Sequence, residues 1–173
     1  MKLVRPEKKY EASWKRAVAE FRKDSKSIKL WEVLGDPDDL DKCISAEENH
    51  SKGKELPSDW VPYDLYWLVD GEEIVGVASV RHSLNDFLLR EGGHVGYEII
   101  PSKRGIGYGN KILELSLAKA GDLGLCRVLV SSFENNNASR KIIENNGGAM
   151  KNRIETEEGI TCRYWIDLFV SKM

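Results

Sequence analysis

The chain has 173 residues, of which 41% are hydrophobic, and its 26 Lys and Arg residues nearly balance its 28 Asp and Glu residues, for a net charge of −2. This composition is typical of a globular protein of about one domain, and it excludes a disordered chain, which would combine low hydrophobicity with high net charge. It also argues against a protein that binds duplex DNA, because such domains are usually strongly basic.

The first sixty residues are expected to be mainly helical. Apolar residues recur at helical spacing from Tyr10 to Phe21, which predicts an amphipathic helix. Asp36-Pro37 has the pattern of an N-cap followed by a first-turn proline and predicts a second helix that continues through Ile44. Residues 51–62 are mostly polar and include glycine and proline, so we expect a loop there.

From Tyr63 on, the pattern changes to strands. Residues 64–69 and 73–81 read as a hairpin with a type I′ turn at Asp70-Gly71, because Asp-Gly tolerates positive φ angles. Residues 83–90 are ambiguous and are compatible with one helical turn ended by Gly92-Gly93. The remaining expected elements are a strand at 94–100, a helix at 107–120, a strand at 127–133, a helix at 136–146, and a hairpin of 149–156 and 160–170 with its turn at Glu158-Gly159. This order predicts a mixed sheet with helices on both faces.

The spacing of cysteines and histidines and the length of apolar runs indicate where the protein is located and whether it binds a metal. The three cysteines form no Cys-x-x-Cys pair and the three histidines stand far apart, so the sequence predicts neither a disulfide framework nor a metal site. The first residues lack the apolar stretch of a signal peptide, and no run reaches the roughly 20 apolar residues that span a bilayer. We therefore expect a cytoplasmic protein with no nucleic-acid or membrane partner.

The chemistry concentrates in one loop between a strand and a helix. The strand that ends at Ile100 continues into Pro101-Ser102-Lys103-Arg104-Gly105-Ile106-Gly107-Tyr108-Gly109. Glycines let the backbone close on a ligand, and the N–H groups and dipole at a helix start favour negative charge. Lys103 and Arg104 add two cations. We expect a pyrophosphate cradle, although an ordinary helix-start turn also uses glycines.

Three phosphate-binding motifs compete for this loop. The P-loop pattern GxxxxGK[ST] is absent. A Rossmann GxGxxG motif needs glycine at its sixth place, which is Asn110 here, and Rossmann chains usually carry the loop after their first strand. The third pattern, Arg-x-x-Gly-x-Gly, matches Arg104 to Gly109 at every fixed position.

With this motif the sequence resembles the GNAT superfamily, the acyl-CoA-dependent N-acyltransferases. A second segment supplies Asn136, Ser139 and Gly147 where that superfamily typically has Asn-x-x-Ser or Asn-x-x-Ala and then glycine eight residues on, and it looks most like the branch that acetylates ribosomal-protein N-termini. The resemblance implies the acyl-CoA N-acyltransferase fold, an α/β (α+β) fold with a mixed, mostly antiparallel six- to seven-stranded sheet, helices on both faces and splayed central parallel strands. It implies one N-acetyltransferase domain over residues 1–173, with N-terminal helices and an acceptor-side loop in 1–62 and the sheet core with the acetyl-CoA site in 63–173.

The resemblance also implies acetyl-CoA as the cosubstrate and assigns residues to it. Pantetheine would lie between the strands at 94–100 and 127–133, and the pyrophosphate would lie on the loop backbone. The cofactor-binding residues implied in this way are Ile99, Ile100, Arg104, Gly105, Ile106, Gly107, Tyr108, Gly109, Asn136 and Ser139. Asn136 also caps the following helix in either reading. Trp31 and Trp60 flank the region where the family builds its acceptor pocket.

The proton-transfer groups depart from the family pattern. An amine would attack the thioester directly, through a tetrahedral oxyanion that a strand N–H can stabilise. Many relatives have a glutamate where this chain has Ser131, so Glu98 is the candidate base, and an outward-facing surface carboxylate is the competing interpretation. The usual tyrosine position is Ile143, which cannot donate a proton, so Ser139 is the candidate acid, although a serine there often just bonds the backbone.

The sequence thus predicts an N-acetyltransferase that moves acetyl from acetyl-CoA to a primary amine of a small molecule, peptide or protein, in a ternary complex and without a metal. The missing tyrosine leaves open an acyl-CoA-binding sensor or interaction module with weak or no catalysis. A NAD-binding oxidoreductase is a third alternative. The identity of the acceptor stays open, as does the choice between monomer and homodimer.

Overall fold

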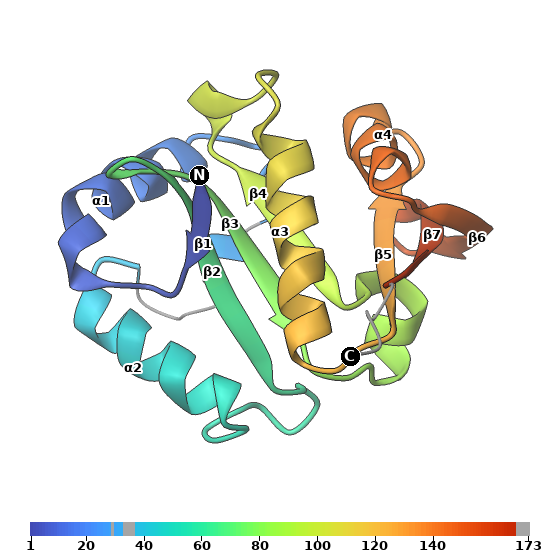
Figure 1. Cartoon of the computed structure of the whole chain (residues 1–173), viewed down its shortest axis with the longest axis horizontal. Coiled ribbons are helices and arrows are strands. Elements are labelled where there is room, and N and C mark those ends of the chain that lie inside the picture. Colours follow the sequence, from blue (N-terminus) through green and yellow to red (C-terminus); the bar gives the residue numbers. More distant parts are fainter. Residues whose placement is uncertain (29, 33–36, 169–173) are drawn as a thin grey trace, which may run out of the picture.

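The strands form two neighbouring antiparallel sheets. The computed structural model describes residues 1–28, 30–32 and 37–168. The four-stranded sheet contains, in spatial order, β1 (Lys2–Val4), β2 (Tyr63–Asp70), β3 (Glu73–Arg81) and β4 (Val95–Ile99), and the three-stranded sheet contains β5 (Arg127–Phe133), β7 (Gly159–Asp167) and β6 (Ala149–Thr156). Figure 1 shows the two sheets side by side, with β4 and β5 as the facing edge strands. The predicted α/β fold with mostly antiparallel strands is confirmed, with the strands divided between two sheets, and β1 is an addition that the sequence patterns did not predict.

Among the described residues, the hydrogen bonds between the strands of the two sheets lie around His94. Its backbone N–H donates to Leu129 O at 2.7 Å, and the Leu129 N–H donates to His94 Nδ1 at 2.9 Å. Burial, helped by the neighbouring Arg81 guanidinium, lowers the pKa of His94 to about 4, so the ring is neutral and Nδ1 can accept. Beyond this contact β4 and β5 share no ladder among the described residues, which confirms the expected splayed pair.

Helices cover both faces of the sheets. On one face lie α1 (Glu11–Phe21) and α2 (Leu40–Ser51), and on the other lie α3 (Tyr108–Asp122) and α4 (Asn137–Asn145). The short turns η1 (Lys8–Tyr10), η2 (Leu30–Glu32), η3 (Leu88–Gly92) and η4 (Pro101–Lys103) connect the larger elements. The apolar stripe of α1 packs on β2, where Trp14 stacks on Trp67 with ring centroids 5.0 Å apart. The opposite face of β4 packs against α3 and α4 through a second apolar cluster.

The start of α2 differs from the expectation. The helix begins at Leu40, because the carboxylate of Asp39 accepts a hydrogen bond from the Lys42 N–H at 3.1 Å and so acts as the N-cap. Pro37 precedes the helix, and the expected N-cap Asp36 lies outside the described residues.

Two hairpin turns also need correction. In the first hairpin the turn residues are Gly71 and Glu72, and only Gly71 has a positive φ, of 62°, whereas a type I′ turn needs positive φ at both. In the last hairpin Thr156 pairs with Gly159, so the turn lies one residue earlier than predicted. The expected end of its second strand, Val170, lies outside the described residues.

Candidate active site where β4 and β5 diverge

The loop after β4 presents free backbone N–H groups at the start of α3. The N–H groups of residues 105–110 donate no hydrogen bond to any part of the chain that the structure describes. Gly105 and Gly107 have φ angles of 82° and 98°, in the left-handed region that other residues rarely adopt, and Gly107 is the N-cap of α3. Free N–H groups at the positive end of a helix dipole form a site for an anion such as a phosphate group.

Gly109 has a different role from the other loop glycines. A Cβ on Gly109 would lie 2.5 Å from Cδ1 of Ile142, so glycine lets the start of α3 lie against α4. The loop glycines therefore serve two purposes, backbone conformation at Gly105 and Gly107 and helix packing at Gly109.

The polar side chains of this loop bond to the protein itself. Lys103 Nζ pairs with Glu73 at 2.8 Å, and the Tyr108 hydroxyl donates to Asp70 at 2.8 Å. Arg104 Nη2 pairs with Asp24 at 2.6 Å, and Arg104 Nε donates to the Ile99 carbonyl at 3.1 Å. Ile106 is exposed. Lys103 and Arg104 therefore fix the loop against neighbouring segments, and the free donors of the loop are its backbone amides.

The edge of β4 that faces β5 presents further backbone groups. The Ile100 N–H donates to Val75 O at 3.1 Å, which points it toward β3. In an antiparallel pair the direction alternates along the strand, so the N–H groups of Tyr97 and Ile99 point toward β5. Of the two strand residues expected to bind pantetheine, Ile99 thus offers its amide to the space between the strands, and the Ile100 amide is already used.

Glu98 lies on the face of β4 that α1 and η2 cover. Its side chain is only 6% exposed, so the surface-carboxylate interpretation does not hold. Oε1 accepts a hydrogen bond from the Ile28 N–H at 3.2 Å and lies 3.8 Å from Arg104 Nη2, while Oε2 accepts none from the described residues. Burial raises the pKa of Glu98, against the opposing effect of hydrogen bonds from Ser27, Ile28 and Leu30 and of the Arg104 charge. The geometry gives a carboxylate with an increased affinity for protons.

Ser139 and Tyr97 meet on the other face of β4. The two hydroxyl oxygens are 3.0 Å apart, and the Ser139 N–H donates to Asn136 Oδ1 at 3.0 Å, so Asn136 is the N-cap of α4 as expected. Burial raises the pKa of Tyr97 to about 12, although the contact with Ser139 acts in the opposite direction. Tyr97 therefore keeps its proton at neutral pH and can donate it.

Sequence reasoning assigned no role to Tyr97. The signal that could have found it is the alternation of a strand, because a residue next to Glu98 must face the opposite side of the sheet. The two positions where the family usually has catalytic groups have structural roles here. Ile143 is fully buried in the apolar cluster, and the Ser131 hydroxyl donates to the Glu91 carbonyl.

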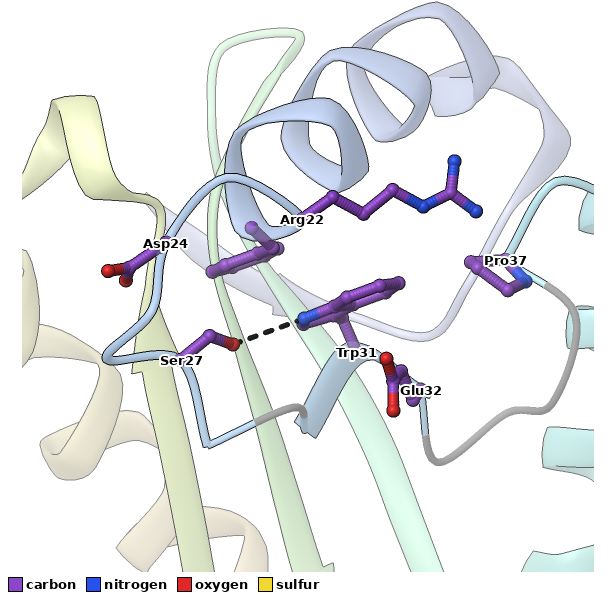
Figure 2. A pocket seen from close by; sticks show the side chains of 7 residues that line it. Arg22, Asp24, Ser27, Trp31, Glu32 and Pro37 are labelled. Carbon is purple, nitrogen blue, oxygen red and sulfur yellow. Dashed lines mark hydrogen bonds between the residues drawn. The ribbon is translucent and has the colours of Figure 1, made fainter.

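Two cavities open on the face that carries Glu98. One has a volume of about 550 Å³ and lies between the end of α1, η2 and Pro37, where the Trp31 Nε1–H donates to Ser27 Oγ at 3.1 Å (Figure 2). Asp24, which binds Arg104, lies at the edge of this cavity nearest β4. The other has a volume of about 560 Å³, and Trp60 lines it. Trp31 and Trp60 thus line separate cavities.

Neither a metal cluster nor a membrane helix is found in residues 1–28, 30–32 and 37–168. No group of three or more His, Cys, Asp and Glu side chains in these ranges could hold a metal ion. No helix in the same ranges is long and apolar enough to cross a membrane.

Comparison with known proteins supports the assignment of the fold. A family model described as an acetyltransferase (GNAT) domain matches residues 10–149. RimJ of Mycobacterium smegmatis, solved with a CoA disulfide, has a TM-score of 0.69 at 14% identity, and the match covers 95% of this chain and 80% of RimJ. RimL, a ribosomal L7/L12 alpha-N-protein acetyltransferase solved with coenzyme A, has a TM-score of 0.67 at 14% identity, covering 96% of this chain and 93% of RimL.

A third solved structure widens the range of similar proteins. The microcin C7 self-immunity acetyltransferase MccE, in complex with acetyl-CoA and AMP, has a TM-score of 0.66 at 15% identity, covering 96% of this chain and 91% of MccE. A search of the curated proteins finds no match. Since these solved structures are all less than 25% identical to the chain, they establish the fold and leave the acceptor to be argued from the site.

Proposed function

The chain belongs to the GNAT acetyltransferase family, and from this premise we propose that it transfers the acetyl group of acetyl-CoA to a primary amine by direct attack in a ternary complex. One observation carries the proposal. A loop with free backbone amides lies at the open end of the space between β4 and β5, with a buried carboxylate on one face of β4 and a pair of hydroxyls on the other. We propose that residues 1–173 act as one domain in the cytoplasm, with 1–62 on the acceptor side and 63–173 around acetyl-CoA.

The backbone of the loop and of β4 would hold the cosubstrate. The free N–H groups of Gly105, Ile106, Gly107, Tyr108 and Gly109 fit a pyrophosphate, because they supply donors and a helix dipole without a competing internal acceptor. Arg104 would support this loop from behind through Asp24 and Ile99. The amides of Tyr97 and Ile99 would then be in position to pair with pantetheine and to stabilise negative charge on the thioester oxygen.

Glu98 would take the proton from the attacking amine. Its raised pKa brings the carboxylate nearer to the value that general bases use at neutral pH. Residues 27–28 cover the carboxylate, so the proton would reach it through one water rather than by direct contact. Glu98 lies on the α1 side of β4, which is the side where an acceptor can approach without crossing α3 and α4.

Ser139 and Tyr97 would supply the proton for the departing thiolate. Their hydroxyls are in hydrogen-bond contact, so Ser139 can give its proton to the sulfur and take one from Tyr97, and the Tyr97 phenolate takes a proton back from solvent before the next turnover. This arrangement would replace the tyrosine that relatives carry at the position of Ile143. Asn136 would keep Ser139 in place through the N-cap bond.

Release of free thiol from acetyl-CoA, measured over a panel of amines, tests this proposal. The panel holds a free amino acid, a polyamine and a peptide with a free N-terminal serine, the last because RimL acts on a ribosomal protein. At least one amine should accelerate thiol release. Glu98→Gln and Ser139→Ala should each lower turnover about 10-fold or more, while Glu114→Gln and Ser83→Ala, at exposed positions, should leave it unchanged. Stabilisation of the protein by CoA with no amine-dependent thiol release would instead favour an acyl-CoA sensor.

A further inference from the structure

The cavity of about 560 Å³ next to β3 combines an apolar wall with one cation. Its lining includes Trp60, Tyr63, Phe87 and Leu88 as apolar residues and Ser79 and Arg81 as polar ones. Trp60 and Phe87 are 43% and 62% exposed, so the aromatic side chains at its mouth are open to a ligand. Asn85 Nδ2 donates to Asp59 O at 2.6 Å and ties the two loops that form the walls. The cavity is therefore a formed site and not a gap between unconnected loops.

Arg81 has no counter-ion in the part of the chain that the structure describes. Its Nη1 donates to the Gly92 and Gly93 carbonyls at 3.3 and 3.2 Å, while Nε and Nη2 have no partner in these ranges. Burial lowers the pKa of Arg81 to about 10, which still leaves the guanidinium charged at neutral pH. Because arginines that are largely removed from water are normally paired with an acid, this guanidinium is suited to an anionic group of a ligand.

The cation lies beside the strand that carries Glu98. A Cβ on Gly96 would be 3.4 Å from Arg81 Nη2, so the guanidinium lies against the middle of β4. Gly96 and Glu98 point to the same face and are separated by about 6.6 Å along the strand. The carbonyls that Arg81 binds lie next to the hydrogen bonds between His94 and Leu129, since a Cβ on Gly93 would be 2.5 Å from Leu129 O. Arg81 and Glu98 thus lie along one face of β4, Arg81 at the narrow end of the diverging strands and Glu98 nearer their open end.

We propose that this cavity binds the acceptor and that the acceptor is an α-amino acid with an apolar side chain. The inference rests on the acetyltransferase function proposed above. The carboxylate would bind Arg81 through Nε and Nη2, and the apolar side chain would lie against Trp60, Phe87 and Leu88. The amine, one carbon from the carboxylate, would then lie over the Gly96 side of β4, and its proton would reach Glu98 through the water proposed above.

Other amine classes fit this cavity less well. A polyamine or an aminoglycoside brings several positive charges toward a guanidinium and leaves it without a counter-ion. A peptide N-terminus has an amide in place of the carboxylate, so it offers Arg81 a neutral oxygen only. The rim carboxylates Asp59 and Asp86 are exposed and attract the ammonium group of an amino acid without holding it.

Rates of thiol release with matched acceptors test the carboxylate. We compare phenylalanine, phenylalanine amide, phenethylamine, glycine and spermidine, each with acetyl-CoA and the full chain. Phenylalanine should have a kcat/KM at least 10-fold above its amide and above phenethylamine. Arg81→Met should remove this preference by lowering the value for phenylalanine about 10-fold or more and leaving that for phenethylamine unchanged. Arg127→Met, at an exposed arginine over Trp165, is the matched control and should change neither.

A second variant tests the apolar wall and does not depend on Arg81. Phe87→Ala should reduce the preference for phenylalanine over glycine about 10-fold, and Leu89→Ala, which is also exposed but does not line the cavity, should not. Quenching of Trp60 fluorescence by phenylalanine alone, absent in a Trp60→Phe variant, reports binding without turnover.

The possible outcomes separate the two proposals. Equal rates with phenylalanine and its amide, or an equal loss for all amines in Arg81→Met, would overturn the amino-acid acceptor. Thiol release with spermidine or a peptide but not with phenylalanine would overturn it too, while leaving the acetyltransferase function in place. If no amine accelerates thiol release, the proposed function itself is wrong.

Discussion

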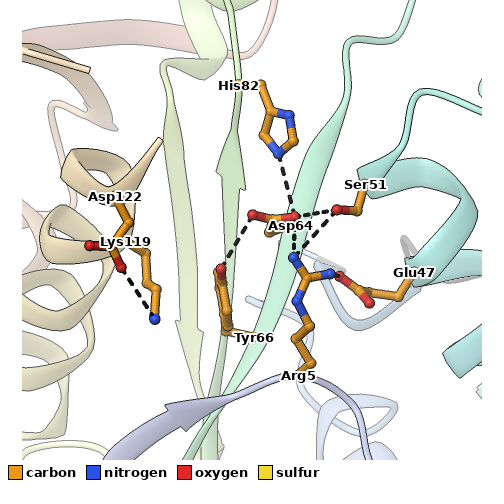
Figure 3. Close-up of polar contacts among 8 residues, drawn as sticks. All are labelled: Arg5, Glu47, Ser51, Asp64, Tyr66, His82, Lys119 and Asp122. Carbon is orange, nitrogen blue, oxygen red and sulfur yellow. Dashed lines mark hydrogen bonds and ion pairs between the residues drawn. The ribbon is translucent and has the colours of Figure 1, made fainter. Parts of the chain in front are cut away.

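Asp64 and Glu98 are two carboxylates of similar burial in opposite surroundings. Asp64, on β2, is 3% exposed, and Glu98, on β4, is 6% exposed. Asp64 accepts hydrogen bonds from Arg5 at 2.7 Å, Ser51 at 2.6 Å and Tyr66 at 3.3 Å, and His82 Nε2 lies 3.4 Å away (Figure 3). Glu98 accepts hydrogen bonds from Ser27, Ile28 and Leu30, all uncharged donors, and its guanidinium neighbour Arg104 is 3.8 Å away. Burial is thus similar in the two carboxylates, and the contact with a cation differs, since Asp64 bonds Arg5 directly and Glu98 does not bond Arg104.

The pKa values of Asp64 and Glu98 differ in the direction that their contacts with cations predict. Burial acts to raise the pKa of Asp64, but the Ser51 hydrogen bond and the charges of Arg5 and His82 outweigh it and lower the pKa below its usual value. At Glu98 the effect of burial is larger than that of the hydrogen bonds and the Arg104 charge, so the pKa is raised. A buried carboxylate that bonds a cation directly stabilises the fold, and one whose donors are uncharged is suited to accept a proton during a reaction.

The largest expected effect is the loss of stability when the cation that binds Asp64 is removed. Arg5 binds both Asp64 and Glu47, so Arg5→Met leaves two buried carboxylates without a cation. We expect the free energy of unfolding at pH 7 to fall by about 2–3 kcal/mol, less than for a fully buried pair because the Arg5 side chain is 44% exposed. Urea denaturation measures the change, with Arg127→Met as the control.

Turnover per folded molecule separates this cluster from the active site. Arg5→Met should leave kcat and KM within twofold at a temperature where the variant is folded, since the cluster lies away from the diverging edge of β4. A loss of stability below about 0.5 kcal/mol, or a 10-fold loss of turnover, would mean that direct contact with a cation does not separate structural from functional carboxylates.

The sequence predicted the elements better than the surroundings of these side chains. The strand at Arg127–Phe133 has the predicted bounds, because strand alternation and turn residues act over a few neighbouring positions. The same holds for the motif of Gly105 and Gly107, whose positive φ angles depend on local conformation. Features that depend on a few neighbouring residues, such as strand bounds and turn glycines, can therefore be predicted from the sequence alone.

The environment of Glu98 and Tyr97 could not be read in this way. Glu98 is buried because Ile28, seventy positions earlier, covers it, and Tyr97 meets Ser139 only after α4 has packed on α3. Arg104 pairs with Asp24 through another distant contact, so its charge supports the loop from behind. The short strand β1 was missed because three residues are too few for a periodic pattern. These features depend on which distant segments meet.

A smaller effect distinguishes the two carboxylates by pH. The pKa of Glu98 is raised above its usual 4.5, so its contribution favours the folded state at low pH and is lost as the pH rises through the folded-state pKa. Glu98→Gln removes the cost of ionising a buried group and should raise the free energy of unfolding at pH 7 by up to about 1 kcal/mol. The gain should vanish near pH 4, where Glu98 is protonated in both states.

Asp64→Asn should behave in the opposite way. The lowered pKa of Asp64 contributes stability above its usual value of 3.8, and this contribution is lost as the pH falls through the folded-state pKa. We expect a loss of about 1–3 kcal/mol at pH 7 that shrinks toward pH 3, measured by thermal and urea unfolding. Destabilisation by both variants at pH 7 would contradict the assignment of Glu98 as a group kept for chemistry.

The smallest effect is expected at an exposed pair beside the same cluster. Lys119 Nζ lies 3.4 Å from Asp122 on α3 and 5.8 Å from the centre of the Tyr66 ring (Figure 3). Asp122→Asn removes an exposed ion pair, but it also removes a negative charge from the last turn of α3, where the helix dipole disfavours it. The two effects oppose each other, so the free energy of unfolding should change by less than about 0.5 kcal/mol and respond little to salt. A change in the free energy of unfolding above about 1 kcal/mol would show that an exposed ion pair next to Tyr66 affects stability as much as a buried one. The contrast between Asp64 and Glu98 would then need another explanation.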